Sequence, residues 1–266
     1  MKKSLLAASV FAVLSFGLVA QGAPVFSETF SYPDGPLLGQ GTPAWTITGT
    51  SVVNPLQVSS GVVPMATTGQ DAYRAFDSVI TPVDGTSFYY GLTLNLSAAQ
   101  ATGDMFVHTT PTLGNTLSFY ARLYAKSSGT GYLLGYLETS GTGSAVNYGT
   151  TVLNFGTPYN VAVAYDFVAG PLNDTARVYI NPTSNTELDN TPYIVDTWTT
   201  ATAEATSYAA FNLRQGSSTA APTISGIDNI AVSTTFSDVA QVPEPSTYAL
   251  LGMGGLALLL RRRSSK

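Results

Sequence analysis

Short runs of alternating apolar and polar residues fill the middle of the chain, and Gly, Pro, Asn, Asp and Ser separate them. Alternation with a period of two is the pattern of a β-strand that buries one face. The clearest run covers residues 88–96, where Leu92, Leu94 and Leu96 fall on the same face. No stretch of this middle part keeps an apolar stripe at helical spacing. The pattern therefore predicts an all-β body.

Further runs of the same kind suggest how the strands are arranged. They cover residues 26–30, 45–48, 105–108, 117–124, 132–138, 159–167, 176–180, 209–213 and 227–232. The turn residues between 167 and 176 predict a hairpin. Many short strands separated by turns favour two antiparallel sheets packed face to face over parallel βαβ units. We expect a single domain, because no linker-like stretch divides the body.

The amino end carries a different pattern. Lys2 and Lys3 precede an apolar run over residues 5–20, and Ala20-Gln21-Gly22 has small residues at both ends. These are the parts of a secretory signal peptide. We predict removal of residues 1–22 by signal peptidase, because a cut after Ala23 would leave a proline next to the cut. The chain is therefore expected to be exported through the inner membrane.

The carboxyl end has three parts, namely an extended proline-rich stretch, an apolar run and a basic cluster. They are Pro243, Glu244 and Pro245, then residues 248–260, then Arg261, Arg262 and Arg263. The prolines disfavour helix, and the arginines stop a membrane segment on its cytoplasmic side. A 13-residue helix rises about 20 Å against about 30 Å of hydrocarbon, so it suits a transient insertion. A simple C-terminal membrane anchor is the alternative.

This order of parts resembles the PEP-CTERM sorting signal of Gram-negative bacteria. The resemblance implies processing by an exosortase-type membrane protease, loss of the apolar segment and the arginines, and delivery to the cell surface or extracellular matrix. The two terminal signals together divide the chain into a signal peptide (1–22), a body (23–240) and a sorting segment (241–266).

The body resembles the concanavalin A-like, LamG-like jelly roll. The hairpin over 159–180, the Asn181-Pro182 that ends it, and the closing run 227–232 carry this resemblance. Pro182 stops ladder pairing, and Asn181 favours a turn. The resemblance implies a lectin-like sandwich.

Charge and cysteine content exclude several functions. Without its two signals the chain has five basic and fifteen acidic side chains, a formal balance of −10, and it has no cysteine. An acidic surface disfavours nucleic-acid binding. Disulfides, zinc-thiolate sites and thiol nucleophiles are absent, so the core must hold the fold.

The sequence offers few catalytic candidates. His108 is the only histidine and would have to serve any Ser-His-Asp triad, but no Gly-x-Ser-x-Gly motif accompanies it. We expect it at the surface or at a strand end. Glu187 and Asp189 are the only closely spaced acids and lie in an expected loop, whereas Asp71 and Asp77 flank a short strand at too wide a spacing. We therefore predict no enzyme, with a secreted polysaccharide hydrolase as the alternative.

A structural calcium ion is the one cofactor that the resemblance suggests. In jelly-roll carbohydrate-binding modules, calcium often joins a Glu near the first strand to an Asp near the last, and Glu28 and Asp228 occupy similar places. Carboxylate oxygens are the ligands that calcium prefers. The alternative is that both acids are ordinary strand or turn residues.

The favoured function is that of a non-enzymatic surface or matrix protein. Its lectin-like sandwich would contribute adhesion, contact with exopolysaccharide or another glycan, or a structural role. The expected partners are signal peptidase, the exosortase-type protease and, transiently, the membrane.

Overall fold

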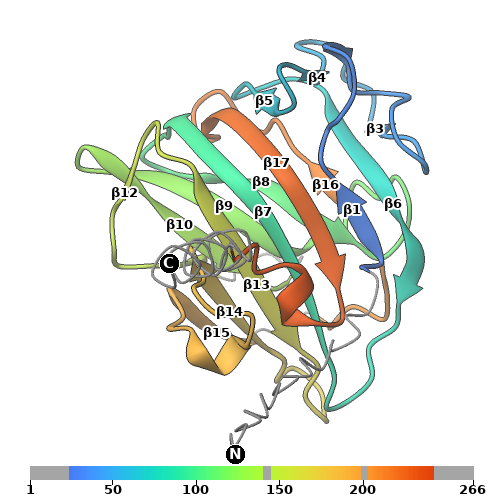
Figure 1. Cartoon of the computed structure of the whole chain (residues 1–266), viewed down its shortest axis with the longest axis vertical. Coiled ribbons are helices and arrows are strands. Elements are labelled where there is room, and N and C mark those ends of the chain that lie inside the picture. Colours follow the sequence, from blue (N-terminus) through green and yellow to red (C-terminus); the bar gives the residue numbers. More distant parts are fainter. Residues whose placement is uncertain (1–23, 140–144, 199–202, 243–266) are drawn as a thin grey trace, which may run out of the picture.

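The computed structural model describes residues 24–139, 145–198 and 203–242, which form two antiparallel sheets packed face to face (Figure 1). This confirms the predicted all-β sandwich. The predicted signal peptide, the Pro243-Glu244-Pro245 motif and the arginine cluster lie outside the described residues. Within the described ranges, no helix is long and apolar enough to cross a membrane.

One sheet has seven strands and the other has eight. The seven-stranded sheet runs in the order β1 (Phe26–Glu28), β17 (Thr223–Ser233), β7 (Ser87–Ala98), β13 (Tyr159–Asp166), β14 (Thr175–Ile180) and β15 (Ile194–Thr197), and β5 (Val63–Met65) also pairs with β17. The eight-stranded sheet runs β11 (Asn147–Tyr148), β10 (Gly131–Leu137), β9 (Tyr120–Ser128), β8 (Asp104–Thr110), β16 (Tyr208–Leu213), β6 (Asp71–Ile80) and β3 (Thr46–Thr48), and β12 (Leu153–Asn154) also pairs with β10. A small ribbon of β2 (Gly35–Pro36) and β4 (Gln57–Val58) and two 3-10 turns, η1 (Glu187–Asp189) and η2 (Phe236–Asp238), complete the described part.

The predicted strands are found with shifted ends. The expected hairpin is the antiparallel pair β13 and β14, and the closing run is the centre of β17. The expected strand 117–124 begins instead at Tyr120, because Asn115 accepts backbone N–H groups of Leu117 and Ser118 and holds them in a turn. Strand β6 has ten residues and is longer than the short strand expected near Asp71.

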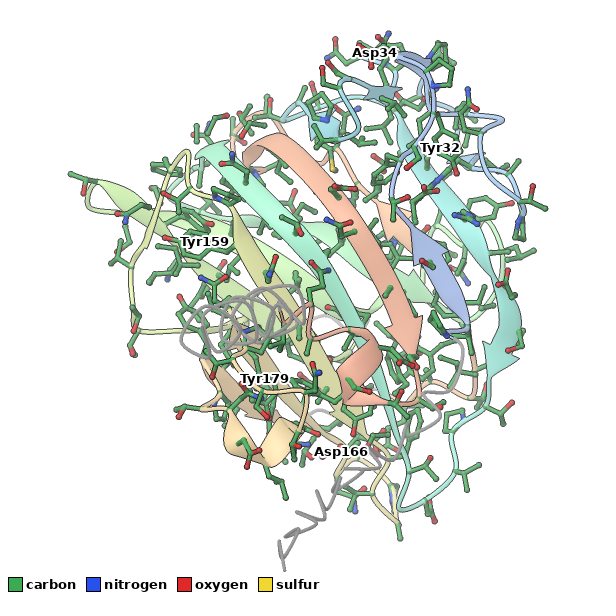
Figure 2. All side chains as sticks on the ribbon, in the orientation of Figure 1. Tyr32, Asp34, Tyr159, Asp166 and Tyr179 are labelled. Atoms are coloured by element: carbon green, nitrogen blue, oxygen red, sulfur yellow. The ribbon has the colours of Figure 1, made fainter. Side chains whose placement is uncertain are left out.

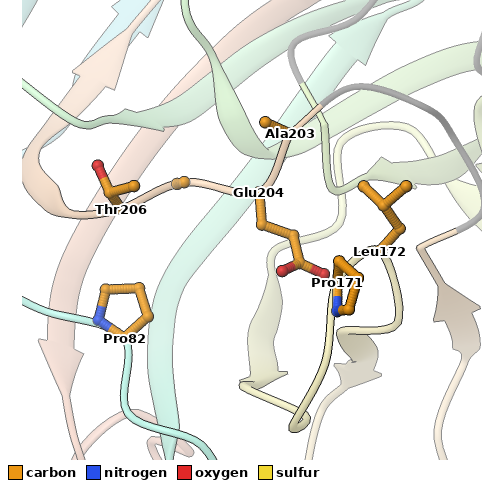
Figure 3. Close-up of a pocket in the computed structure, with 7 residues that line it drawn as sticks. Pro82, Pro171, Leu172, Ala203, Glu204 and Thr206 are labelled. Carbon is orange, nitrogen blue, oxygen red and sulfur yellow. The ribbon is translucent and has the colours of Figure 1, made fainter.

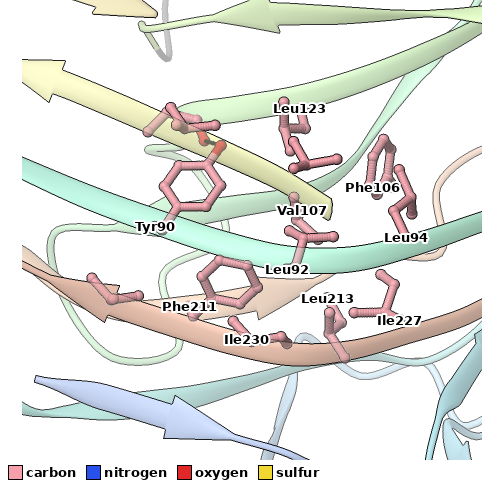
Figure 4. Close-up of a cluster of buried hydrophobic side chains, with 14 of the residues drawn as sticks. Tyr90, Leu92, Leu94, Phe106, Val107, Leu123, Phe211, Leu213, Ile227 and Ile230 are labelled. Atoms are coloured by element: carbon pink, nitrogen blue, oxygen red, sulfur yellow. Dashed lines mark hydrogen bonds between the residues drawn. The ribbon is translucent and has the colours of Figure 1, made fainter. Parts of the chain in front are cut away.

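The core is the apolar layer between the two sheets. Leu92 and Leu94 of β7 meet Leu123 of β9 and Phe211 and Leu213 of β16 there, and all five are fully buried (Figure 4). Each such side chain contributes about 1.5–3 kcal/mol through burial. In a chain without disulfides, this layer supplies most of the stability.

Residues 234–242, which we call the C-terminal strap, fold back over the outer face of the seven-stranded sheet. Phe236 of η2 packs edge-on against Tyr179 and Tyr89, with ring centroids 5.2 and 5.8 Å apart. Val239 lies so close to β7 that a Cβ on Gly91 would come within 2.2 Å of its carbonyl oxygen. Glycine at position 91 therefore allows the strap to dock.

We predict that Gly91→Ala destabilises the body by about 1–3 kcal/mol, the usual range for overpacking. The added methyl group must push the Val239 carbonyl off the sheet. Urea denaturation of the secreted body measures the change. In a chain that ends at Ser233 the same substitution should cost much less, and an equal cost in both chains would show that the strap is not the cause.

Candidate functional site

Glu28 lies at the centre of a buried polar network at the start of the body. Its Oε1 accepts the backbone N–H of Phe30 at 2.7 Å, and its Oε2 accepts the Tyr32 hydroxyl at 2.9 Å and the Trp45 indole N–H at 2.8 Å. An Arg74 nitrogen lies 2.7 Å from the same Oε2. Glu28 is 3% exposed, so this ion pair is buried.

The predicted calcium pair, Glu28 and Asp228, lies on the paired strands β1 and β17, but Glu28 is opposite Ile230 and Asp228 is opposite Thr93. The nearby charge of Glu28 adds to burial in raising the pKa of Asp228, which accepts only the N–H of Asn229. The arrangement does not fit a calcium ion at Glu28, because protein donors already engage both oxygens and Arg74 supplies the positive charge. Among the described residues, no three His, Cys, Asp or Glu side chains converge on one point. Calcium binding by this chain stays a prediction.

His108 is buried, contrary to the expectation of a surface or strand-end residue. It lies within β8 and is 2% exposed. The ring of Phe119, from the loop after β8, packs edge-on against it with a centroid distance of 4.5 Å. Burial, followed by the charges of Arg214 and Arg122, lowers the pKa of His108 to about 3. The imidazole is therefore neutral at physiological pH.

Strand alternation places His108 on the outer face of the eight-stranded sheet. Its partner in β16 is Asn212, whose neighbours Phe211 and Leu213 point into the core. Thr48 donates to Asn212 from β3, and Asn212 donates to Thr110 on β8. These contacts use the polar groups beside His108 but not its ring. Neither imidazole nitrogen has a hydrogen-bond partner in the part of the chain that the structure describes.

A pocket of about 270 Å³ opens beside this histidine, and we call it the His108 pocket. Its lining residues are Thr48, Gly49, Asp71, His108, Thr116, Phe119 and Arg214. Burial raises the pKa of Asp71 to about 6, and its Oδ1 accepts the N–H of Gln215 at 2.7 Å. Arg214 is held in place by Asp104 at 2.9 Å. The pocket thus combines a neutral histidine, a carboxylate, a guanidinium group and hydroxyls with one aromatic wall.

An aromatic platform lies on the same face over β9 to β11. Arg122, Tyr124 and Lys126 alternate with the core residues of β9, and Arg122 lies 5.6 Å from the Tyr124 ring. The Lys126 ammonium lies 4.0 Å from the ring of Tyr148. Tyr148 lies against Gly135, where a Cβ would come within 2.7 Å of the ring. We call the outer face of the eight-stranded sheet, with this platform and the His108 pocket, the pocket face.

Three of the five cations of the body lie on the pocket face. The other two are paired elsewhere: Arg74 with Glu28, and Arg177, on the opposite outer face, with Asp166 at 2.7 Å and Glu187 at 2.7 Å. Figure 2 shows Asp166 near the end of the seven-stranded sheet. The pocket face therefore holds most of the body's cations, together with the acids Asp71 and Asp104.

Two carboxyl groups face each other between the sheets, at an edge of the sandwich. Glu138 follows β10 and Asp196 lies on β15, and their side chains are within hydrogen-bonding reach. Glu138 Oε2 and Asp196 Oδ2 are buried without a donor in the described residues. Burial, and then the hydrogen bond with Asp196, raises the pKa of Glu138 to about 8. A proton shared between the two groups satisfies both oxygens.

The acids that the sequence analysis considered do not form such a pair. Glu187 and Asp189 lie in η1, where Glu187 binds Arg177 and Asp189 accepts the Ser184 hydroxyl. The sequence did not predict Glu138 and Asp196 as a pair of acids, because 58 residues separate them. They come together only where the edges of the two sheets meet.

The largest of the described pockets, of about 620 Å³, lies elsewhere (Figure 3). Pro82, Pro171, Leu172 and two alanines line it, and its one acid, Glu204, accepts the backbone N–H of Asn173 at 2.9 Å. It offers apolar walls and a single engaged carboxylate, so it has fewer convergent polar groups than the His108 pocket.

We predict that Arg74→Met destabilises the body by about 3–5 kcal/mol, the usual cost of leaving a buried charge unpaired. The matched variant Asp228→Ala should cost much less. Thermal melts with and without EDTA in the same series test the calcium prediction. A melting temperature that falls in EDTA, together with a small effect of Arg74→Met, would reverse our assignment of the positive charge beside Glu28.

We also predict that stability falls between pH 6.5 and pH 8. The pKa of Glu138 is raised on folding, so its contribution is fully present below the unfolded pKa and is lost as the pH rises towards 8. The pKa shifts of His108 and Asp71 change stability mainly below pH 6.5, and deprotonation of the unfolded His108 above pH 6.5 offsets only about 0.4 kcal/mol of the loss. The expected loss is about 1–2 kcal/mol over this window. Urea titrations of wild type and Glu138→Gln at both pH values measure it.

Glu138→Gln should flatten the decline, because its amide donates to Asp196 at every pH. The exposed Asp189→Asn should behave as wild type. Parallel slopes for wild type and Glu138→Gln would contradict the shared proton.

Comparisons with known proteins bear mainly on the tail. No curated protein matches the chain. Among solved structures, one similar to this chain is the CBM2 module of the evolved Dit of Lactobacillus casei BL23 phage J-1, with 12% identity, coverage of 79% of this chain and 94% of that chain, and a TM-score of 0.44. A second is the globular domain of T. cruzi calreticulin, with 8% identity, coverage of 91% and 100%, and a TM-score of 0.47. A third is domain 4 of AbnA, a GH43 extracellular arabinanase from Geobacillus stearothermophilus, in complex with arabinotriose, with 15% identity, coverage of 74% and 88%, and a TM-score of 0.40. At these identities and TM-scores, the similarities do not identify a ligand for this chain.

The tail gives a more specific result. Residues 241–263 match the PEP-CTERM protein-sorting motif, which confirms the sequence resemblance. The match indicates a protein that is exported and sorted to the cell envelope, with processing by an exosortase.

Proposed function

We propose that this chain is a non-enzymatic protein of a Gram-negative cell surface or extracellular matrix, and that its pocket face binds a glycan. The sorting motif supports the location. The observation that carries the binding function is the His108 pocket, where a buried, neutral histidine with two unpartnered nitrogens lines a polar cavity beside an aromatic ring.

The chemistry of the pocket suits sugar hydroxyls. A neutral imidazole has one N–H donor and one acceptor nitrogen, and a hydroxyl can satisfy either. Asp71 adds an acceptor and Thr48 and Thr116 add hydroxyls, so the lining can pair with several adjacent hydroxyl groups. Unpartnered buried polar atoms are costly, and a ligand hydroxyl that reaches the imidazole nitrogens when Phe119 moves aside regains that free energy.

The aromatic platform supports an extended ligand rather than a single small molecule. Tyr124 and Tyr148 are partly exposed and lie on strands that continue the sheet away from His108. Tyrosine presents an apolar ring and a polar hydroxyl together, as the faces and edges of a sugar ring require. A chain of sugar units could therefore occupy the pocket with one unit and the platform with others.

The geometry of the acids favours binding over cleavage. Glycosidases that retain configuration hold their two carboxyl groups about 5 Å apart, and inverting enzymes hold them farther apart. Glu138 and Asp196 share a hydrogen bond instead, and they lie between the sheets rather than on an open face. A polysaccharide hydrolase remains the second hypothesis that the experiment below addresses.

We predict that the purified body, residues 23–242, binds members of a polysaccharide array, and that Tyr124→Ala weakens binding about tenfold, equivalent to about 1.4 kcal/mol. Phe119→Ala should weaken it similarly, because it removes the wall of the His108 pocket. The matched control is Tyr89→Ala, which removes a partly exposed ring from the opposite outer face.

Turnover is assayed in the same wells. Binding without product release, weakened about tenfold in Tyr124→Ala and unchanged in Tyr89→Ala, is the expected result. Release of shorter sugars would refute the non-enzymatic function. Equal losses in both variants would remove the pocket face as the binding surface.

A further inference from the structure

Gln241, near the end of the C-terminal strap, is fixed to the middle of the seven-stranded sheet. Thr93 on β7 donates to Gln241 Oε1 at 2.8 Å, and Asn160 on β13 donates to the Gln241 carbonyl at 3.3 Å. Gln241 Nε2 donates to the carbonyl of Asn229 on β17 at 2.5 Å. Three adjacent strands therefore hold the first residue of the matched sorting motif.

The strands are shaped to receive the strap. Asn229 has a left-handed backbone, with φ of 50°, and lies in an irregularity of the β7–β17 pairing between Asp228 and Ala231. Gly91 leaves the space that the Val239 backbone occupies, and Phe236 fills the surface beside Tyr179. Figure 1 shows η2 against this sheet, on the side away from the eight-stranded sheet. The strap is thus docked by apolar packing along its length and by hydrogen bonds at its end.

Docking limits how far the tail can reach. Six residues, 242–247, separate Gln241 from the apolar run that begins at Tyr248. Fully extended, they span about 20 Å. When the apolar run is in the membrane, the outer face of the seven-stranded sheet must lie within about that distance of the bilayer surface.

The path from the strap around the sheet edge to the pocket face is too long for the tether to bring the pocket face to the bilayer surface. Strand β7 lies two strands from the nearer sheet edge, which is about 10 Å, and the sheets themselves lie about 10 Å apart. Side chains on both outer faces lengthen this path further. A tether of about 20 Å that starts at the strap therefore cannot bring the opposite face to the bilayer.

We propose that the outer face of the seven-stranded sheet, with the docked strap, is the membrane-side surface of this protein during sorting. Its partner is the lipid headgroup surface around the inserted tail, and the pocket face points away from the membrane. The inference rests on the proposed sorting function. It adds an orientation that allows the glycan-binding face to be exposed before the tail is cut.

Single-cysteine labelling tests the orientation, because the natural chain has no cysteine. A fluorophore is attached to Thr234→Cys in the strap or to Leu117→Cys in the loop beside the His108 pocket, both at exposed positions. The full chain from residue 23, with its tail intact, is reconstituted into phosphatidylcholine vesicles that carry a headgroup-attached quencher. We expect severalfold stronger quenching at position 234 than at position 117. Equal quenching, or stronger quenching at 117, would overturn the proposal.

Releasing the strap provides the second arm. Gly91→Ala and Gln241→Ala, each added to the Leu117→Cys chain, should raise quenching at 117, because the freed strap lengthens the tether by about 25 Å. Thermal melts confirm that each variant is folded. Unchanged quenching at 117 in both folded variants would show that docking does not set the orientation.

Flotation with the vesicles distinguishes a wrong orientation from a tail that does not insert into the membrane. A chain that floats but shows no difference between the positions overturns only the orientation. A chain that fails to float contradicts membrane insertion of the tail, and the proposed sorting function fails together with the inference.

Discussion

The structure depends on the exclusion of water from the layer between the two sheets. Without disulfides, nothing else in the described chain is large enough to offset the entropy of ordering about two hundred residues. The inward positions of nearly every long strand are accordingly apolar, as Leu92, Leu94 and Phe211 illustrate. Polar chemistry is thereby confined to the two outer faces, the sheet edges and a few paired groups. The position of the candidate site is a consequence of this constraint.

The buried polar groups that do occur are placed where the sandwich has to be closed. Glu28 and Arg74 connect the first strand of one sheet to β6 of the other. Glu138 and Asp196 meet where the edge strands of the two sheets come together, and Asn147 of β11 donates to Asp196 at 3.1 Å. In these two pairs the charge is compensated by an opposite charge or a shared proton, since an isolated charge in this layer would cost several kcal/mol. His108 differs from them, because it is buried on an outer face and its ring nitrogens have no hydrogen-bond partner among the described residues.

Short-range sequence patterns predicted the individual strands and turns, because these depend on residues that are close together in the sequence. The alternation of Leu92, Leu94 and Leu96 identified the longest strand, and the turn before Thr175 identified its neighbouring hairpin. The pairing of β8 with β16 could not be predicted, because their residues are about a hundred positions apart and no periodicity encodes which strands become neighbours. For the same reason, the sequence showed His108 as a lone histidine, and its burial under Phe119 emerged only from the fold. The partner of Glu28 was also missed, since Arg74 lies 46 residues away and a short strand near Asp71 gave no sign that it would reach the first strand.

On both sheets, every second side chain of a strand points outward, but the outward residues of the two sheets differ. This difference places the strap on one outer face and the candidate binding site on the other. On the seven-stranded sheet, small residues such as Gly91, Ala162 and Ala164 leave a shallow surface on which a chain segment can lie. On the eight-stranded sheet, the corresponding positions carry Tyr124, Lys126 and His108, which are large and polar and leave no comparable surface for the strap. The tail therefore leaves the body from the face whose Arg177 and Thr93 are already engaged by neighbouring side chains. Because the core fixes the two faces back to back, the exit of the sorting segment and the candidate binding surface cannot exchange sides without refolding the sandwich.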